Sequence, residues 1–174
     1  MSKGVKIFLS IMLIIFVICL GVIFILQYQI NKTYTQIEEL NPGFNVLFNV
    51  TPKKNDDNRV KFDIETNLPN GFELIVTVKD DFTEYMGQDK VVVNNGKIST
   101  DWFSNNNKGL NGDYEVSFIS PLNDLQPDNI KHIIGENGEK MHGGNIRENR
   151  LQVTYIMTVT QDEISLKKGI KAKG

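Results

Sequence analysis

An unbroken apolar run at positions 7–26, without one charged side chain, constrains this chain more than any other feature of its sequence. A helix needs about 20 predominantly apolar residues to cross a bilayer, and the run reaches that length. We therefore predict an N-terminal transmembrane helix that uses Ile7, Phe16 and Leu26 among its anchoring residues. All the residues after it must then lie on one side of the membrane.

Two other interpretations of this N-terminus compete with a permanent anchor. A cleaved signal peptide has a shorter apolar region and small residues at its cleavage site, whereas Gln, Tyr, Gln and Ile occupy positions 27–30. A lipoprotein signal places small residues before its modified cysteine, but bulky residues fill positions 16–18, before Cys19. We favour an uncleaved signal anchor. Cys19 is the only cysteine, so the rest of the chain has neither disulfides nor a cysteine nucleophile.

Charge predicts the orientation and excludes one class of partner. Lys3 and Lys6 precede the run, and positive charge stays on the cytoplasmic side. Residues 1–6 are therefore predicted to be cytoplasmic, and the bulk of the protein to be extracytoplasmic at the cell membrane. All but two of the 19 basic side chains and all 21 acidic ones follow the run, so this part is mildly acidic. A nucleic-acid binder needs a basic surface, so we expect no nucleic-acid partner.

Positions 27–43 read as a stalk or linker between the membrane and the next domain. Apolar residues here continue a seven-residue spacing, which leaves a homodimer through the stalk as one alternative to a plain helix. The spacing is carried by two series: Ile23, Ile30 and Ile37, and Leu26, Thr33 and Leu40. Three or four heptads are needed for a coiled coil, and the stretch is shorter than that. Pro42 and Gly43 end any helix.

From position 44 to 160 the apolar period changes to two, the pattern of half-buried strands. The clearest strands are expected at 60–65, 72–79, 114–119 and 151–159, and weaker ones at 44–50, 90–93 and 98–103. Asn94-Asn95-Gly96 predicts a hairpin turn, because Asn and Gly tolerate positive φ. About seven short strands with frequent turns indicate an all-β fold, an antiparallel β-sandwich.

One short helix interrupts the strands. Pro127 suits a first helical position and Gly135 the residue past the end. Ile130, Ile133 and Ile134 would form its apolar face. The glycine-rich segment 135–144 that follows, and the polar loop 105–112, are the expected contact surfaces together with the strand edges. The last residues, 161–174, contain four lysines and read as a basic flexible tail.

The segment Gly112-Asp113-Tyr114 followed by alternating apolar residues resembles the strand entry of immunoglobulin-like domains. Further turn motifs, among them 66–71, 126–127 and 135–138, extend the resemblance over about residues 58–160. The family it resembles consists of uncharacterised bacterial exported domains carried on lipoprotein signals or membrane anchors. The resemblance implies an immunoglobulin-like sandwich with Tyr114 bonded back to nearby backbone and Trp102 as a core residue. It carries over no catalytic residue.

Few residues offer chemistry. His132 and His142 are the only histidines, and their spacing matches no metal-site motif. No nucleophile motif and no phosphate-binding loop is present. The acidic pairs Asp56-Asp57 and Asp80-Asp81 lie at strand ends, where calcium could bind, but outside any EF-hand pattern.

We therefore expect no catalytic residue, metal ligand or cofactor. The predicted function is non-enzymatic binding or scaffolding at the cell surface, with membrane lipid around the anchor and a protein or cell-surface partner. An extracellular sensor of calcium or a small ligand is the alternative. An enzyme acting on the cell wall would need two close carboxylates in a cleft, or His132 beside His142.

Overall fold

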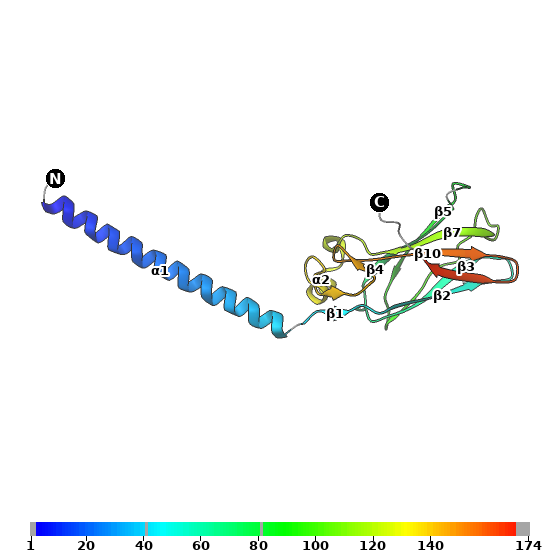
Figure 1. The fold of residues 1–174 in the computed structure, drawn as a ribbon, viewed down its shortest axis with the longest axis horizontal. Helices are drawn as coiled ribbons and strands as arrows, with labels where there is room; N and C mark the ends of the chain where they lie inside the picture. The colour runs from blue at the N-terminus through cyan, green and yellow to red at the C-terminus, as the bar shows by residue number, and fades with distance from the viewer. Residues whose placement is uncertain (1–2, 41, 81, 170–174) are drawn as a thin grey trace. The chain divides into compact units, whose positions relative to one another are not determined.

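The computed structural model describes residues 3–40, 42–80 and 82–169. Within the first range, side chains are described at positions 4, 12–13, 15–30 and 32. The chain forms two separate units, Met1–Pro42 and Gly43–Gly174. The first contains one helix, α1 (Lys3–Leu40), and the second, called here the β domain, contains the strands (Figure 1). The predicted anchor and the described part of the stalk are therefore continuous in one helix.

The apolar side chains of helix α1 that the structure describes are exposed. Phe24 is 73% exposed, Phe16 and Leu26 are more than half exposed, and Cys19 is exposed too. The side chain of Ile7, like those of Ile37 and Leu40 in the stalk, lies outside the described set. Among the described residues, no helical segment has the length and apolarity required to cross a membrane.

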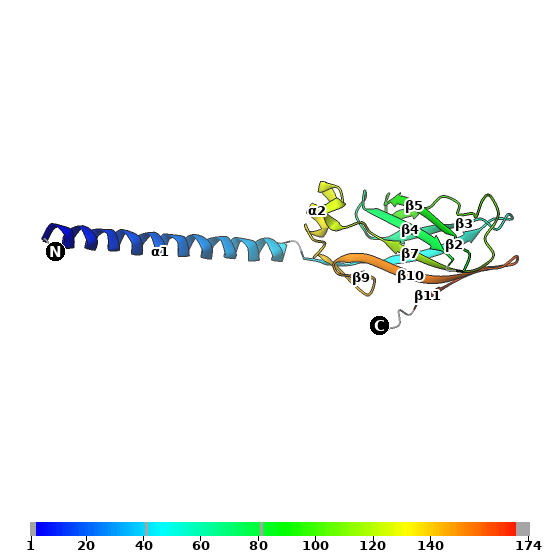
Figure 2. The same ribbon diagram turned by 90° about the horizontal axis from the view of Figure 1, so that it is seen from above.

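The β domain is built from two antiparallel sheets that pack face to face (Figure 2). The smaller sheet has the order β2-β3-β6, with strands Phe48–Lys54, Val60–Thr66 and Lys97–Ser99. The larger has the order β5-β4-β7-β10-β11, with strands Met86–Val92, Glu73–Lys79, Gly112–Ile119, Arg150–Val159 and Ile164–Lys168. Strand β9 (Ile146–Arg147) pairs with β10. A parallel pair joins β1 (Phe44–Asn45) to β8 (Met141–His142).

Alternating side chains from both sheets form a single core, as the period of two predicts. In β4, Leu74, Val76 and Val78 are fully buried while their neighbours lie on the outer face. The Phe118 ring of β7 packs edge-on against Phe48 and Phe62 of the opposite sheet, with centroids 5.6 and 5.5 Å away. These contacts join the two layers, and the predicted all-β fold is confirmed.

The β domain has two distinct ends. At the near end, where the chain enters at Gly43, the Phe44 amide donates to the Lys140 carbonyl over 2.8 Å. This end carries β1, β8 and helix α2 (Figures 1 and 2). The strands run away from it to the far end, which carries the turns at 55–58, 80–85, 103–110 and 160–163. The Lys54 ammonium joins two of these turns by donating to the Gln161 carbonyl.

Helix α2 (Asp128–Ile134) lies where the sequence predicts a helix, with two differences. The first difference is that Pro127 occupies the N-cap position rather than the first helical turn. Gly135 follows the last turn, as predicted, with φ +88°. The second difference is the extent of the apolar face. Ile130 and Ile134, four residues apart, are fully buried, but Ile133 is 46% exposed. The apolar face is narrower than predicted because the helix is only two turns long and contacts the sandwich along one line.

The turn at Asn94-Asn95-Gly96 has the predicted geometry but a different role. Asn95 and Gly96 both have positive φ, and Asn94 and Lys97 exchange two backbone hydrogen bonds. The flanking strands then separate, because β5 pairs with β4 of the large sheet and β6 with β3 of the small one. The turn thus connects the two layers rather than two strands of one sheet.

The prediction of a flexible tail over 161–174 is wrong for its first half. Ile164–Lys168 forms β11, which pairs antiparallel with β10 along its whole length. Ile164 and Leu166 face inward and pack against the core. A segment with only two inward apolar residues can form this strand because the neighbouring β10 supplies its backbone hydrogen bonds. Residues 170–174 lie outside the described range.

Trp102 is not the core residue that the sequence predicts, because its side chain is 43% exposed. Strand β6 ends at Ser99, and the inward position that follows is taken by Phe103, whose backbone pairs with Val60. The irregular backbone between them turns Trp102 outward, and the Lys61 ammonium lies 5.4 Å from the centre of its ring.

Candidate binding surface

The two histidines, which the sequence offers as candidate catalytic or metal-binding residues, lie on different elements. His142 lies in β8, beside β1, and His132 lies in the exposed part of α2. Across the described residues, no group of three or more His, Cys, Asp and Glu side chains has the geometry to hold a metal ion.

The acidic pairs lie in turns at the far end. Asp56 and Asp57 are exposed between β2 and β3. Asp80 follows β4, and its carboxylate accepts hydrogen bonds from the Thr83 hydroxyl (2.6 Å) and the Phe82 amide (2.8 Å). These two donors, the hydroxyl first, hold the pKa of Asp80 below its usual 3.8. Asp81 lies outside the described residues. The Asp80 carboxylate thus shapes its own turn.

Tyr114 makes the backbone contact that the resemblance implies. Its hydroxyl donates to the Asn111 carbonyl (3.2 Å) and accepts from the Asn111 amide (3.1 Å). The ring of Tyr85 stands edge-on to the Tyr114 ring, with centroids 5.9 Å apart. Burial, and to a lesser degree Tyr114, raises the pKa of Tyr85. This ring contact joins the end of the β4–β5 connection to β7.

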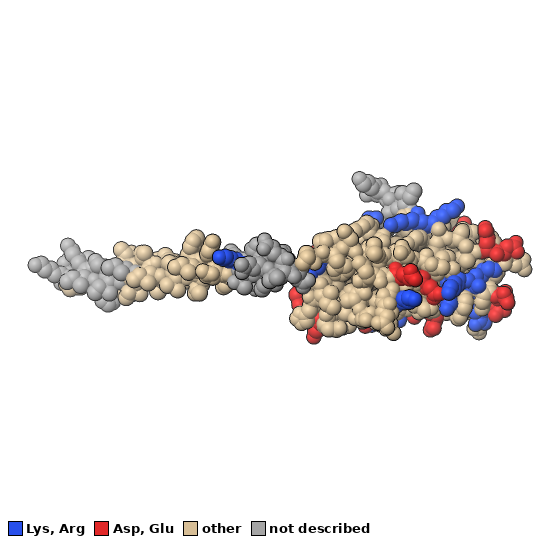
Figure 3. Space-filling model, turned by 90° about the horizontal axis from the view of Figure 1, so that it is seen from below, with Lys and Arg blue, Asp and Glu red and all other residues tan. Residues whose placement is uncertain are grey.

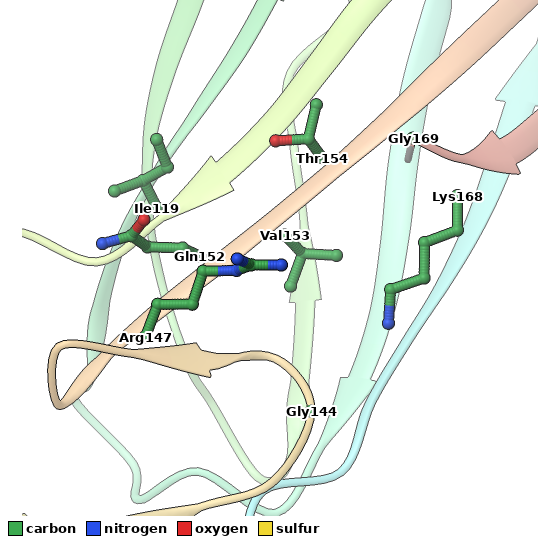
Figure 4. A pocket seen from close by; sticks show the side chains of 8 residues that line it. All are labelled: Ile119, Gly144, Arg147, Gln152, Val153, Thr154, Lys168 and Gly169. Carbon is green, nitrogen blue, oxygen red and sulfur yellow. The ribbon is translucent and has the colours of Figure 1, made fainter. Parts of the chain in front are cut away.

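A small basic hollow lies on the outer face of the large sheet (Figure 4). Arg147, from β9, and Lys168, from β11, reach toward it from opposite sides. The Lys168 ammonium donates to the Asn145 side-chain oxygen over 2.8 Å. The hollow holds about 50 Å³. Ligand pockets usually hold at least about 300 Å³, so this one fits ordered water better than a metabolite.

A second depression, called here the far-end groove, is larger and differently built. It holds about 150 Å³ and is lined by Lys79, Asp80, Phe82, Asp113, Glu115 and Ile156, with Tyr114 beside them. Three neighbouring strands and one turn supply these residues, since β4 and β10 pair with the two sides of β7. The groove therefore rests on the rigid middle of the sheet.

Apolar side chains in this groove are exposed rather than covered. Phe82 is 96% exposed at the tip of its turn, and Ile156 is 44% exposed on the outer face of β10. Met86, which pairs with Lys79 on the neighbouring strand, is exposed as well. A group of exposed apolar side chains with a polar rim is typical of an interaction site, whereas a single exposed one is not.

Carboxylates form the rim. The Thr158 hydroxyl donates to Asp113 over 2.6 Å, and Lys79 lies 3.4 Å from Glu115. Among the described residues, Asp113 is in no ion pair. Three carboxylates and one ammonium therefore surround the apolar floor. The face of the β domain seen in Figure 3 carries both signs of charge.

The two loops expected to be contact surfaces both make backbone hydrogen bonds within the β domain. In 105–112, Asn105 and Lys108 close a tight turn, and the Leu110 amide donates to Asn58. In 135–144, β8 pairs with β1 and Met141 is buried. The exposure of Phe82 was not predicted, although a Phe between acidic and polar residues in the sequence is consistent with it.

Comparison with protein-family models, with curated proteins and with solved structures gives no match for this chain.

Proposed function

We propose that this protein is a membrane-anchored extracytoplasmic binding domain that recruits or holds a partner at the cell surface without catalysing a reaction. Helix α1 is the anchor, the β domain is an immunoglobulin-like module, and the far-end groove is its contact surface. Each of these three parts has separate support.

Two observations support the anchor. The uncharged run at 7–26 has the length of a membrane span, and the described apolar side chains of α1 lie on all of its faces and are exposed. A helix that is apolar all round needs an apolar environment on every side. At about 1.5 Å per residue α1 is about 57 Å long, which exceeds the roughly 30 Å hydrocarbon core and leaves a stalk.

Strand order supports the immunoglobulin-like module. If the strands are lettered in chain order, β2-β3-β6 corresponds to A-B-E and β5-β4-β7-β10 to C′-C-F-G. Tyr114, near the start of the F-like β7, bonds back to Asn111 at the corner before it, as in immunoglobulin-like domains. Strand β11 extends the larger sheet by one strand beyond this pattern.

The exposure of Phe82 in a carboxylate-rimmed groove is the observation that carries the binding role. The groove lies at the far end of the β domain, whereas the chain enters from α1 at the near end. Protein interfaces are organised around an aromatic anchor with a polar rim, and the far-end groove has both.

Photo-crosslinking in the native membrane tests this role. A photoreactive residue replaces Phe82 in the full-length protein, and in a second variant it replaces Ile133, an exposed apolar residue at the near end. We expect a discrete crosslinked partner from position 82 and none from position 133. Equal adducts from both positions, or none from position 82, would contradict the proposed contact surface.

A further inference from the structure

We infer that the far-end groove binds a cationic protein segment in which lysine or arginine side chains flank an apolar one. This inference rests on the proposed function, because it names the chemistry of the partner at the same groove. It follows from the arrangement of apolar and acidic groups rather than from either alone.

The apolar part of the groove has room for a side chain from outside. Phe82 projects from the turn at one side and Ile156 from β10 at the other, with the backbone of β7 between them. The Asp80 carboxylate accepts hydrogen bonds from the Phe82 amide and the Thr83 hydroxyl, and these hydrogen bonds hold the Phe82 backbone beside the end of β4. An incoming apolar side chain would be covered by both residues and would in turn cover Phe82.

The carboxylates around the groove favour positively charged groups on either side of that incoming side chain. Asp113 and Glu115 are two residues apart on β7, so both carboxylates lie on the same face, and Asp80 lies at the neighbouring strand end. The donors to these carboxylates are neutral: the Thr158 hydroxyl donates to Asp113, and the Thr83 hydroxyl and the Phe82 amide donate to Asp80. A cation of the partner would strengthen such hydrogen bonds, and it could also lie over the face of Phe82.

The same rim argues against a lipid surface as the occupant. An exposed Phe beside lysines would suit an anionic bilayer, but three carboxylates around Phe82 repel anionic headgroups. A metal ion is not favoured as the occupant either, because the described residues of the groove include no group of three or more side chains arranged as metal ligands. A cationic peptide segment satisfies both the apolar floor and the acidic rim.

Peptide binding to the full-length protein in neutral detergent micelles tests the inference. The probe is a fluorescently labelled pentapeptide, Gly-Lys-Leu-Lys-Gly with blocked ends, compared with Gly-Glu-Leu-Glu-Gly and Gly-Lys-Ser-Lys-Gly. Fluorescence anisotropy reports binding. We expect saturable binding of the lysine-leucine peptide only, and a loss of about tenfold in affinity for Phe82→Ser and for the double variant Asp113→Asn, Glu115→Gln.

A matched control removes the same two charges elsewhere at the far end. Asp162→Asn with Glu163→Gln changes the exposed β10–β11 turn, which does not line the groove. This variant should bind the lysine-leucine peptide like the unchanged protein. The inference is overturned if it loses as much affinity as the groove variants, if the glutamate peptide binds equally well, or if the protein binds phosphatidylglycerol vesicles through Phe82.

The two proposals fail in different ways. A specific crosslink from position 82 without binding of the lysine-leucine peptide would keep the contact surface and overturn its cationic partner. Absence of the crosslink would overturn the contact surface itself.

Discussion

At the scale of single residues, the hydroxyls of Tyr114 and Tyr85 provide a matched pair. The Tyr114 hydroxyl has two backbone hydrogen bonds to Asn111, whereas the Tyr85 hydroxyl is buried without a partner among the described residues. We predict that Tyr114→Phe lowers the free energy of unfolding by about 1 kcal/mol and that Tyr85→Phe leaves it unchanged or raises it. Urea unfolding followed by the fluorescence of the single tryptophan measures both, and equal losses would contradict this explanation.

Asp63 allows a test by titration. The Lys53 ammonium and then the Ser99 hydroxyl hold the pKa of the Asp63 carboxyl below its usual 3.8. A lowered pKa means that the ionised carboxylate stabilises the fold above pH 3.8 and that this contribution disappears as pH falls through the lowered value. We predict that Ser99→Ala moves the NMR titration midpoint of Asp63 upward. The same change at Ser117, on the outer face of the other sheet, should not move it.

At the scale of elements, one side chain replaces a missing strand. Strand β7 pairs with β4 only as far as Ile75, so the backbone of Glu73 would lack a partner on that side. Gln126, which is buried, fills this position: its oxygen accepts from the Glu73 amide and its nitrogen donates to the Glu73 carbonyl, both over 3.0 Å. The segment before α2 is thereby joined to the sheet.

We predict that Gln126→Leu lowers the free energy of unfolding by about 2 kcal/mol, because it leaves a buried amide and carbonyl of Glu73 without partners. The same substitution at Gln152, on the outer face of β10, should change it by no more than about 0.5 kcal/mol. Urea unfolding of the two variants and the unchanged protein decides the matter. If Gln126→Leu left the free energy of unfolding unchanged, water would be forming the hydrogen bonds to the Glu73 amide and carbonyl.

Helix α2 offers a second comparison within one element. Ile130 is fully buried and Ile133 is 46% exposed. Truncating a buried isoleucine leaves a cavity, so we predict a loss of about 3 kcal/mol for Ile130→Ala and of about 0.5 kcal/mol for Ile133→Ala. Similar losses at both positions, measured by thermal or urea unfolding, would mean that α2 packs differently.

The sequence predicts where the strands lie along the chain better than it predicts which strands and side chains pack together. The period of two located β3, β4, β7 and β10 because each has one face in the core. Trp102 and β11 were misjudged because their surroundings depend on distant strands: Phe103 takes the inward position against Val60, and β10 supplies the partner for Ile164–Lys168. The far-end groove could not be predicted either, since Phe82, Glu115 and Ile156 meet only through sheet pairing.

At the scale of the whole molecule, the chain has an apolar helix and a β domain, and the proposed contact surface lies at the end of that domain away from Gly43. Both units follow from the sequence pattern, since a charge-free run and a period-two region cannot belong to the same element. The side of the membrane on which the β domain lies rests on Lys3 and Lys6 alone. That placement is the central claim, because the partner must be reachable from the cell surface.

Labelling with a membrane-impermeant maleimide tests this placement most directly. Cys19 is the only cysteine, so Cys19→Ser gives a background into which one cysteine is introduced, either as Asp162→Cys in the exposed far-end turn or as Ser2→Cys. The account predicts that position 162 is labelled on intact cells and position 2 only after the cells are permeabilised. Labelling of position 2 on intact cells, with position 162 protected until permeabilisation, would contradict it.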